Sequence, residues 1–249
     1  MRKSLLNQPL DIYDFQQLEH LVRANFLKSR QLKIVTLNPE MIVNAKKNFE
    51  FQAALNNANI VIPDGTGITW AFEVLSGVKV NRVPGIELAE RILSIANELN
   101  KSVAIFGGTS ETLEKVLKLF KSLYPKINVV KLVDGYQGIN QDDVIAKEIS
   151  GTSPDVVLVA LGSPRQEVWI NKNSDLFPRS ILIGIGGSLD VWAGKVMRAP
   201  EWMRTRGLEW LFRLISQPKR STRILKSLPV FVFMVLTKKL GSVKSSRMN

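Results

Sequence analysis

The chain has 249 residues, no cysteine, one histidine and a formal net charge of +12. Its length suits one large α/β domain, or a domain of about 190 residues with an appendage. The lack of cysteine excludes disulfides, thiolate nucleophiles and cysteine-based metal sites. His20 lies in a polar N-terminal stretch, where we expect it on the surface of a helix. Acid–base chemistry then falls to carboxylates, and Ser-His-Asp chemistry and histidine-rich metal sites are disfavoured.

The positive charge is concentrated at the C-terminal end. Residues 192–249 contain 13 lysines and arginines but only two glutamates, a net charge of +11, whereas residues 1–191 carry a net charge of +1. We therefore expect a nearly neutral body over residues 1–191 and a basic appendage over residues 192–249. Such asymmetry indicates an anionic partner, which is either nucleic acid or an anionic membrane surface.

The N-terminal sequence begins with basic residues but has no apolar segment of signal-peptide length. Asn7, Gln8 and Asp11 interrupt the apolar residues. We therefore expect a cytoplasmic protein.

Apolar runs alternate with helical patterns after a first, N-terminal helix. The runs are residues 32–37, 60–62, 102–106, 127–132, 155–161 and 180–185. The fifth run is almost entirely Val, Leu and Ala, which is typical of a central parallel strand that is covered on both faces. This alternation predicts a Rossmann-like α/β fold with a doubly wound, mostly parallel sheet.

The turn after the second run is the principal candidate for chemistry. Pro63 cannot donate to a strand ladder, so the strand ends there, and Asp64 follows before Gly65. Asp64 then lies at the carboxyl end of a strand, which is the edge where open parallel sheets bind ligands. An ordinary Asp-Gly turn or a helix N-cap is the structural alternative.

Polar residues near other strands are further candidates. Thr36 ends the first strand and faces the same edge as Asp64, while Asn38 and Pro39 fit the N-cap and N1 positions of the next helix. Arg82 lies in a loop, where it is either solvated or able to grip a phosphate bidentately.

Later strand ends leave similar alternatives open. Gly107 and Gly108 begin a small-residue turn that lets backbone amides approach a phosphate, although an ordinary capped connection fits as well. Gln137 lies in a polar loop that either reaches a nucleobase or merely turns the chain. Ser163 and Gln166 fit a capping box, so the pattern is at least as compatible with a structural role for Gln166 as with a substrate contact.

The appendage combines basic and apolar residues. Residues 208–215 place apolar side chains at helical spacing, Pro218 interrupts, and residues 230–236 are seven consecutive apolar residues. That run is far shorter than the ~20 residues that span a bilayer, so short amphipathic pieces in the membrane interface are expected. The alternatives are a helix packed on the body and a basic arm on nucleic acid. The lack of zinc-finger or heptad spacing and the apolar run disfavour nucleic acid.

Several motifs occur in a fixed order between residues 33 and 223. They are TLNPEM, IPDGTGI, RVPGIEL, FGGTSE, LGSPRQE, IGGSLDVWAGKVMRAPEWM and GLEWLFRL. Together they resemble the WecG/TagA/CpsF family of glycosyltransferases, glycosyltransferase family 26, and most closely its TagA-type N-acetylmannosaminyltransferases. The block from RAPEWM to GLEWLFRL is the most specific part of this resemblance.

The resemblance implies an inverting reaction without metal or other cofactor. N-acetylmannosamine moves from UDP-N-acetylmannosamine to the 4-hydroxyl of N-acetylglucosamine on undecaprenyl diphosphate, as in the linkage unit of wall teichoic acid. It also implies a peripheral protein on the inner face of the cell membrane.

The resemblance also implies roles for individual residues. Asp64 matches the catalytic base, Thr36 and Gln166 match sugar-positioning residues, and Arg82 matches a pocket arginine. The full set of expected substrate contacts is Thr36, Asn38, Arg82, Gly107, Gly108, Gln137 and Gln166. The appendage is expected to supply arginines to the diphosphate when it docks at the membrane, and the matching residues are Arg213, Arg220 and Arg223.

Alternatives remain at this stage. One alternative is transfer from another UDP-sugar, such as that of N-acetylmannosaminuronic acid or a hexose. The other is a non-enzymatic membrane or nucleic-acid adaptor with a nucleotide-binding fold. A Rossmann oxidoreductase is disfavoured because no G-x-G-x-x-G follows the first strand. We also expect a homo-oligomer, a dimer or trimer through the body, and no nucleic-acid partner.

Overall fold

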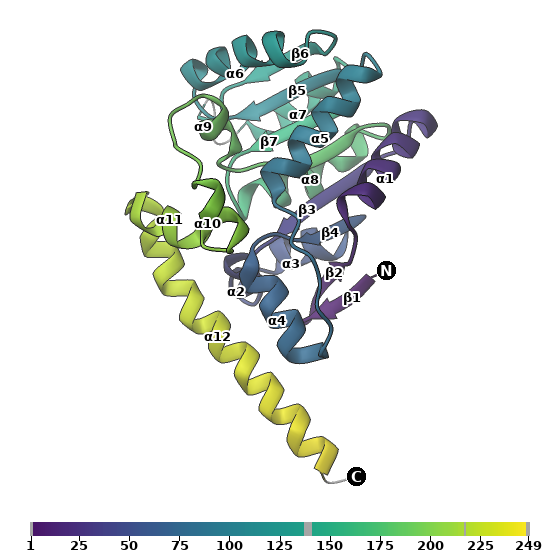
Figure 1. Ribbon diagram of the computed structural model, residues 1–249. Coiled ribbons are helices and arrows are strands. Elements are labelled where there is room, and N and C mark those ends of the chain that lie inside the picture. The colour runs from purple at the N-terminus through teal and green to yellow at the C-terminus, as the bar shows by residue number, and fades with distance from the viewer. Residues whose placement is uncertain (1, 137–140, 217, 248–249) are drawn as a thin grey trace.

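The structure is a computed structural model that describes residues 2–136, 141–216 and 218–247, with side chains described for the same residues except 218–221 and 242–247. Gln137 therefore lies outside the described residues, and Arg220 outside the described side chains. Figure 1 shows an α/β body from which one long helix projects.

Within the described chain, six parallel strands form the central sheet in the order β4-β3-β8-β7-β5-β6. They are β3 (Leu32–Leu37), β4 (Ile60–Pro63), β5 (Ser102–Gly107), β6 (Asn128–Val133), β7 (Val156–Ala160) and β8 (Ile181–Gly184). The expected doubly wound parallel sheet is thus confirmed. Every expected strand is present, with its ends displaced by no more than one residue.

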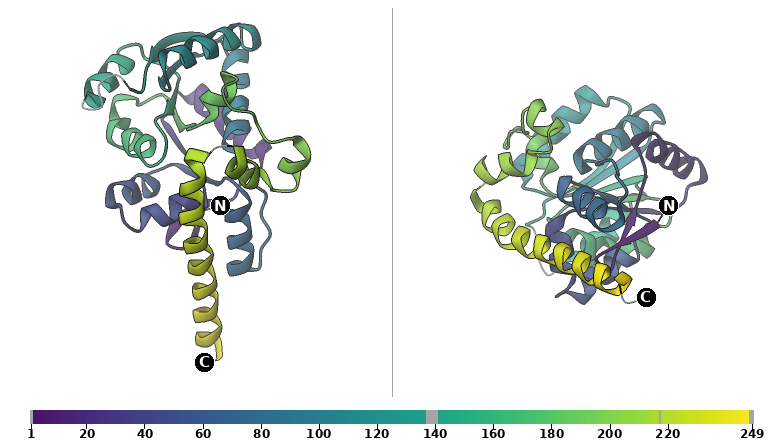
Figure 2. Two further views of the ribbon diagram at one scale, coloured as in Figure 1. Left: turned by 90° about the vertical axis from the view of Figure 1, so that its left-hand side faces the viewer. Right: turned by 60° about the horizontal axis from the view of Figure 1, so that its bottom comes forward.

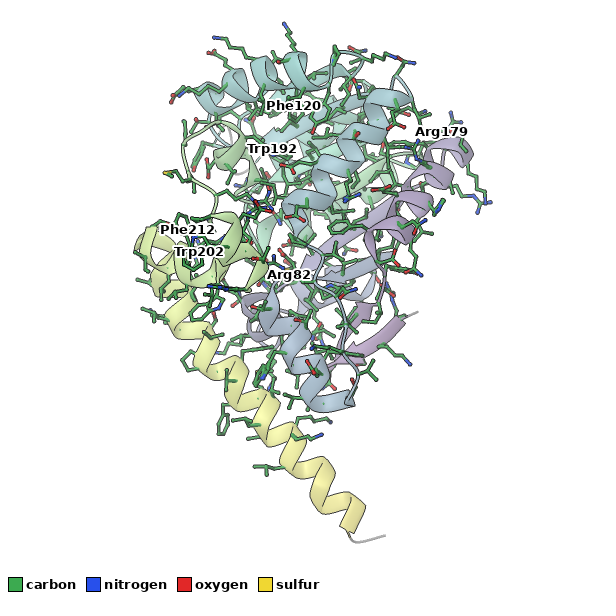
Figure 3. The ribbon with its side chains drawn as sticks, in the orientation of Figure 1. Arg82, Phe120, Arg179, Trp192, Trp202 and Phe212 are labelled. Atoms are coloured by element: carbon green, nitrogen blue, oxygen red, sulfur yellow. The ribbon has the colours of Figure 1, made fainter. Side chains whose placement is uncertain are left out.

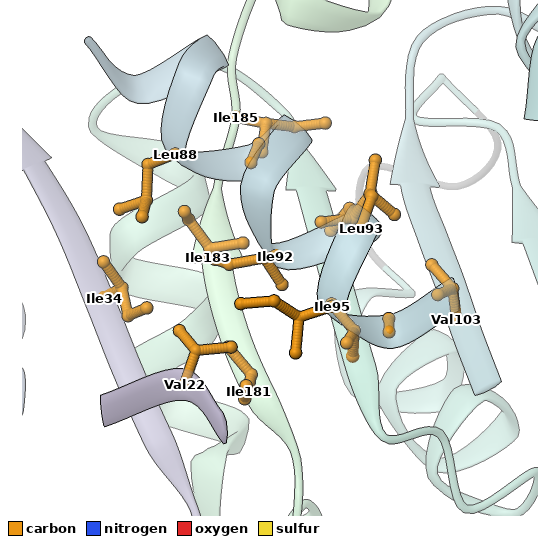
Figure 4. Packing of buried hydrophobic residues seen from close by; sticks show 14 of the residues in the cluster. Val22, Ile34, Leu88, Ile92, Leu93, Ile95, Val103, Ile181, Ile183 and Ile185 are labelled. Atoms are coloured by element: carbon orange, nitrogen blue, oxygen red, sulfur yellow. The ribbon is translucent and has the colours of Figure 1, made fainter. Parts of the chain in front are cut away.

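Helices cover both faces of this sheet. One face carries α1 (Phe15–Lys28), α5 (Gly85–Glu98) and α6 (Ser110–Leu123), whose apolar side chains pack on alternate strand residues (Figure 4). The other face carries α2 (Pro39–Ala45), α3 (Phe49–Asn56), α4 (Thr66–Ser76), α7 (Asp142–Ser150) and α8 (Arg165–Asn173). The short 3-10 helix η1 (Ser174–Leu176) follows α8 and contacts α7 and α8. Strands that are buried on both faces explain the unbroken apolar runs in the sequence. His20 is exposed on α1, as expected.

A hairpin precedes the first helix, in a stretch where the sequence pattern predicted no strand. Its strands are β1 (Arg2–Leu5) and β2 (Gln8–Asp11), which pair antiparallel. The buried Asp11 carboxylate accepts from the Val61 N–H at 2.8 Å and from Arg2. Leu5 and Leu10 are also buried in the core with α2, α3 and α4. Because the hairpin has only four-residue strands and its contacts are with distant residues, local patterns offered little sign of it.

The appendage consists of helices that follow α9 (Ser188–Trp192). They are α10 (Glu201–Thr205), α11 (Glu209–Ser216) and α12 (Pro218–Arg247). α12 runs along α2 and α4 and then extends past the body (Figure 2). The expected succession of short pieces is therefore wrong for this part of the chain, because Pro218 starts the helix at its first turn and Pro229 lies within it.

One side of α12 packs on the body. Phe231 and Val235 are fully buried with the apolar residues of α2, α3 and α4, whereas Phe233 is 68% exposed. The run 230–236 thus divides between the core and the surface. The packed helix that the sequence left as an alternative is present, and an exposed apolar stripe remains beside it. No helix within the described ranges is long and apolar enough to cross a bilayer.

Candidate active site

A cavity of about 510 Å³ lies at the carboxyl ends of β3, β4 and β8. The body supplies its floor, and residues of α11 and α12 line it from the appendage side. This volume is within the range of small-molecule sites. Arg82 lies where the appendage meets the body (Figure 3). The cavity therefore brings together the two parts of the chain that composition distinguished.

Asp64 lies in this cavity directly after β4. Its backbone N–H donates to the Leu37 carbonyl at 2.8 Å, which ties the turn to the neighbouring strand, and Gly65 follows with φ +90°. Glycine suits that backbone conformation because it has no Cβ. The turn therefore directs the Asp64 carboxyl group out of the sheet and into the cavity region.

Loss of hydration raises the pKa of Asp64 to about 6. The positive charges of Arg213 and Arg82 and the Gly85 amide lower this pKa, while the negative charge of Glu209 raises it, and burial has the largest effect. A carboxylate with such a pKa is ionised at neutral pH and is a stronger base than an ordinary aspartate. Asp64 can therefore accept a proton from a bound hydroxyl group.

Of the arginines that line the cavity, Arg82 and Arg213 are those whose charges act on Asp64. Arg82 comes from the loop before α5 and Arg213 from α11. Glu209 pairs with both, at 3.4 Å from Arg82 Nη1 and 2.5 Å from Arg213 Nη2. The ends of α4 and α10 meet beside them, since Thr66 Oγ1 donates to the Gly207 carbonyl at 3.0 Å. The positive charges are thus in place for an anionic ligand.

Thr36 and Asn38 also line the cavity, from the end of β3 and the start of α2. The Thr36 side chain lies against Gly85, at which a Cβ would come within 3.0 Å of its hydroxyl oxygen. Asn38 is the N-cap of α2, and its side chain accepts from the Met41 N–H at 3.1 Å. Asn38 therefore has the structural role that the sequence indicated and is also placed at the cavity.

Gln166 is buried and reaches the cavity from the start of α8. Its Nε2 donates to Glu167 Oε1 at 2.6 Å, and its Oε1 accepts from the Gly186 N–H at 3.0 Å. The amide is therefore fixed in one orientation. The expected capping box with Ser163 is wrong, because Pro164 is the N-cap of α8 after a cis Ser163–Pro164 bond and no side chain caps the helix.

Gly107 and Gly108 do not line this cavity. A Cβ on Gly107 would lie 2.3 Å from the Ala160 carbonyl oxygen, so this glycine lets β5 and β7 approach each other. Gly108 has φ +69° at the turn into α6. Both glycines therefore have structural reasons for their identity, and their contact with a substrate stays a prediction, as does that of Gln137.

The appendage arginines differ in their placement. Arg213 and Arg223 line the cavity, the latter from α12 as an exposed side chain. Arg220 lies among the side chains outside the described set. Glu209 was not predicted from the sequence, although its spacing of four from Arg213 is that of an ion pair on one helix face.

Carboxylate and histidine groupings of the kind that bind metals are not found among the described residues. The cavity instead combines a basic carboxylate with guanidinium groups at the carboxyl edge of a parallel sheet. That arrangement is typical of α/β enzymes that bind phosphorylated ligands at this edge.

Comparison with known proteins identifies the class of enzyme. The chain belongs to the glycosyl transferase WecG/TagA/CpsF family, whose family model matches residues 3–245. This membership confirms the resemblance noted in the motifs, and the protein is a glycosyltransferase rather than an adaptor or an oxidoreductase.

Curated relatives match most of the chain. A Bacillus subtilis (strain 168) protein is 36% identical over 203 residues, which are 82% of this chain and 78% of the relative. A Bacillus spizizenii protein is 32% identical over 243 residues, 95% of this chain and 93% of the relative. A Staphylococcus aureus (strain MW2) protein is 34% identical over 207 residues, 83% of this chain and 80% of the relative. All three are named N-acetylglucosaminyldiphosphoundecaprenol N-acetyl-beta-D-mannosaminyltransferase.

Proposed function

We propose that this protein transfers N-acetylmannosamine from UDP-N-acetylmannosamine to the 4-hydroxyl of N-acetylglucosamine on undecaprenyl diphosphate, with Asp64 as the general base. The observation that carries the proposal is the Asp64 carboxyl group, whose pKa of about 6 suits a base, in a cavity that also presents Arg82 and Arg213. The names of the relatives supply the acceptor and the transferred sugar.

The proposed reaction needs one base and one anion-stabilising group. The Asp64 carboxylate takes the proton of the acceptor hydroxyl as that oxygen attacks the anomeric carbon. The bond between the anomeric carbon and the phosphate oxygen breaks, and UDP leaves with the bonding electrons. The guanidinium groups stabilise the negative charge that develops on the departing diphosphate. Attack from the face opposite UDP converts an α-linked donor into a β-linked product.

We propose roles for the remaining cavity residues, and their position in the cavity lining supports these roles. Thr36 and the fixed amide of Gln166 are proposed to position the sugar, with Asn38 beside them. Arg223 stands at the α12 wall and is proposed to join Arg213 on the diphosphate. Arg220 is proposed for the same role on the basis of the family resemblance.

Membrane association is proposed to hold the enzyme at its lipid-linked acceptor. The support is the net charge of +11 over residues 192–249 and the exposed apolar residues of α12. These residues are Leu225, Val230, Phe233, Leu236 and Leu240. The proposed location is therefore the inner face of the cell membrane, and the proposed pathway is synthesis of the teichoic acid linkage unit.

The test is acceptor-dependent release of UDP from UDP-N-acetylmannosamine with a lipid-linked N-acetylglucosamine acceptor. In the Asp64→Asn variant, turnover should fall by about 10²- to 10⁴-fold because the base is lost. The matched control is Asp175→Asn, which makes the same change at an exposed position outside the cavity and should retain activity.

Other outcomes are informative. Release from a different UDP-sugar alone would contradict the proposed donor and leave the role of Asp64 in place. An Asp64→Asn variant with unchanged turnover would contradict the proposed base. No release from any UDP-sugar, with every acceptor, would contradict the proposed transfer.

A further inference from the structure

Glu209 is a buried carboxylate at the start of α11, and its side chain is only 11% exposed. Oε1 accepts from Arg213 Nη2 at 2.5 Å, and Oε2 lies 3.4 Å from Arg82 Nη1. Arg82 also donates to the Arg204 carbonyl at 3.0 Å. Glu209 therefore links a guanidinium group of the body to one of the appendage.

A carboxylate at this position reduces the repulsion between Arg82 and Arg213. Arg82 and Arg213 both line the cavity, and their side chains are 19% and 43% exposed, so water only partly screens the repulsion between the two like charges. Glu209 offsets that repulsion. Each guanidinium group has five N–H donors, and the hydrogen bonds to Glu209 take one from each, so further donors remain for a ligand.

The carboxylate is also fixed by its own helix. Glu209 lies in the first turn of α11, where the helix dipole favours a negative charge, and it precedes Arg213 by four residues in the favourable order for an ion pair. These two interactions should keep the Glu209 carboxylate in place when an anion binds to the two arginines.

We propose that Glu209 is a positioning residue that holds Arg82 and Arg213 together across the boundary between body and appendage, so that their remaining N–H groups receive the diphosphate of the donor. This inference rests on the proposed function, because it takes a nucleoside diphosphate as the ligand. In a different role, the Glu209 carboxylate would occupy the place of the diphosphate and would have to be displaced by it. That role predicts that removing the carboxylate strengthens UDP binding, whereas the positioning role predicts that it weakens it.

The same carboxylate acts on the catalytic base. The charged groups that face Asp64 are Arg213, Glu209 and Arg82, and the negative charge of Glu209 raises the pKa of Asp64. Other ionisable groups on the cavity wall are Glu40, Asp190, Arg198 and Arg223. Neutralising Glu209 should therefore lower the pKa of Asp64 and move the acid limb of kcat/KM to lower pH.

The test measures binding of UDP itself by calorimetric titration to the full-length protein. Glu209→Gln should weaken UDP binding by about tenfold, because the two guanidinium groups lose the charged partner that orients them. The matched control is Glu201→Gln, an exposed glutamate of α10 that makes the same change in net charge and should bind UDP as the wild type does. The pH profile of kcat/KM supplies a second measurement that a purely structural role would not shift.

The results separate the inference from the proposed function. If the wild type does not bind UDP, the proposed function is contradicted. If the wild type binds UDP and Glu209→Gln binds it equally or more tightly, the positioning role is overturned. Should Glu209→Gln fail to fold, Glu209→Asp keeps the charge and shortens the reach. The Glu209→Asp variant should bind UDP more weakly than the wild type, with the acid limb of kcat/KM unchanged. If it binds UDP as tightly as the wild type does, the positioning role is overturned.

Discussion

At the scale of single residues, Asp64 shows how a strand end becomes a reactive position. The turn is fixed by a backbone hydrogen bond to β3 and by the positive φ of Gly65, so the backbone of Asp64 is held at the cavity. Loss of hydration there raises the pKa of its carboxyl group to about 6. A group that is useful as a base is thereby costly to the folded state when it is ionised.

Replacing Asp64 by Asn should therefore stabilise the protein at neutral pH. The folded pKa of about 6 lies above the ordinary value of 3.8, so the wild type loses stability as the pH rises through this window. The gain in the free energy of unfolding should be about 3 kcal/mol near pH 8 and roughly half of that near pH 5. Urea denaturation at the two pH values measures it.

Asp175→Asn is the control for this comparison, because the residue is exposed and its loss should change stability little at either pH. A variant at position 64 that is less stable than the wild type near pH 8 would show that the ionised carboxylate contributes net stabilising contacts.

At the scale of elements, the junction of α4 with α10 and α11 determines how the appendage meets the cavity. Gly207 has φ +72°, and a Cβ there would lie 2.3 Å from Thr66 Cγ2, while its carbonyl accepts from Thr66 Oγ1 at 3.0 Å. Glycine is thus required both by the backbone conformation and by the close approach. The fit between Gly207 and Thr66 holds Glu209 and Arg213 near Asp64.

Gly207→Ala should displace this junction. Gly194 is a matched position, because it has φ +69° and a Cβ added there would meet no heavy atom within 4 Å. Gly194→Ala should cost about 1 kcal/mol of unfolding free energy from backbone strain alone. Gly207→Ala should cost roughly 1–3 kcal/mol more and should also raise the KM for the UDP-sugar. Thermal unfolding and steady-state kinetics measure these effects, and equal effects of the two substitutions would contradict the importance of the Thr66 contact.

α12 has two apolar sides with different surroundings. Phe231 is fully buried against the body, and Phe233, two residues later, is 68% exposed. Successive positions of a helix point in different directions, so one apolar run supplies both the contact with the body and the exposed stripe. The buried side accounts for a long helix that persists through Pro229.

At the scale of the whole molecule, charge and apolar exposure gather on the same part of the chain. The appendage carries a net charge of +11, and α12 extends past the body (Figure 1). Several apolar side chains of α12 are exposed. Basic residues near an anionic leaflet contribute about 1 kcal/mol each to membrane binding, and salt weakens that attraction.

The expected dimer or trimer through the body stays a prediction.

The full-length protein should bind vesicles that contain anionic lipid more strongly than neutral vesicles, with binding reduced at high salt. Phe233→Ala should weaken vesicle binding by roughly tenfold because a large apolar surface is lost. Leu27→Ala is the matched control, since Leu27 is 79% exposed on α1 rather than on α12. Vesicle co-sedimentation measures both variants. Equal loss of binding in the two would contradict a membrane contact through α12.

Local patterns in the amino-acid sequence were sufficient to predict the parallel sheet, the place of Asp64 and the division of charge. Apolar runs of strand length, each followed by a helical pattern, leave few topologies open, and parallel strands bring Thr36 and Asp64 to one edge. Net charge is a property of composition and needs no fold. These features could be predicted because they follow from composition and from the local order of apolar runs and turns, whereas the order of the strands in the sheet depends on contacts between distant segments and was not predicted.

The way in which the appendage completes the cavity, by contrast, emerged only from tertiary packing. A glutamate in the first turn of a helix is common, so the sequence gives no sign that Glu209 belongs to the cavity. Its contact with Arg82 joins residues 127 positions apart. The N-terminal hairpin and the burial of Phe231 likewise depend on surfaces that lie distant in the chain. Contacts of this kind are fixed by packing, since the local pattern is compatible with several partners until the body supplies the one that fits.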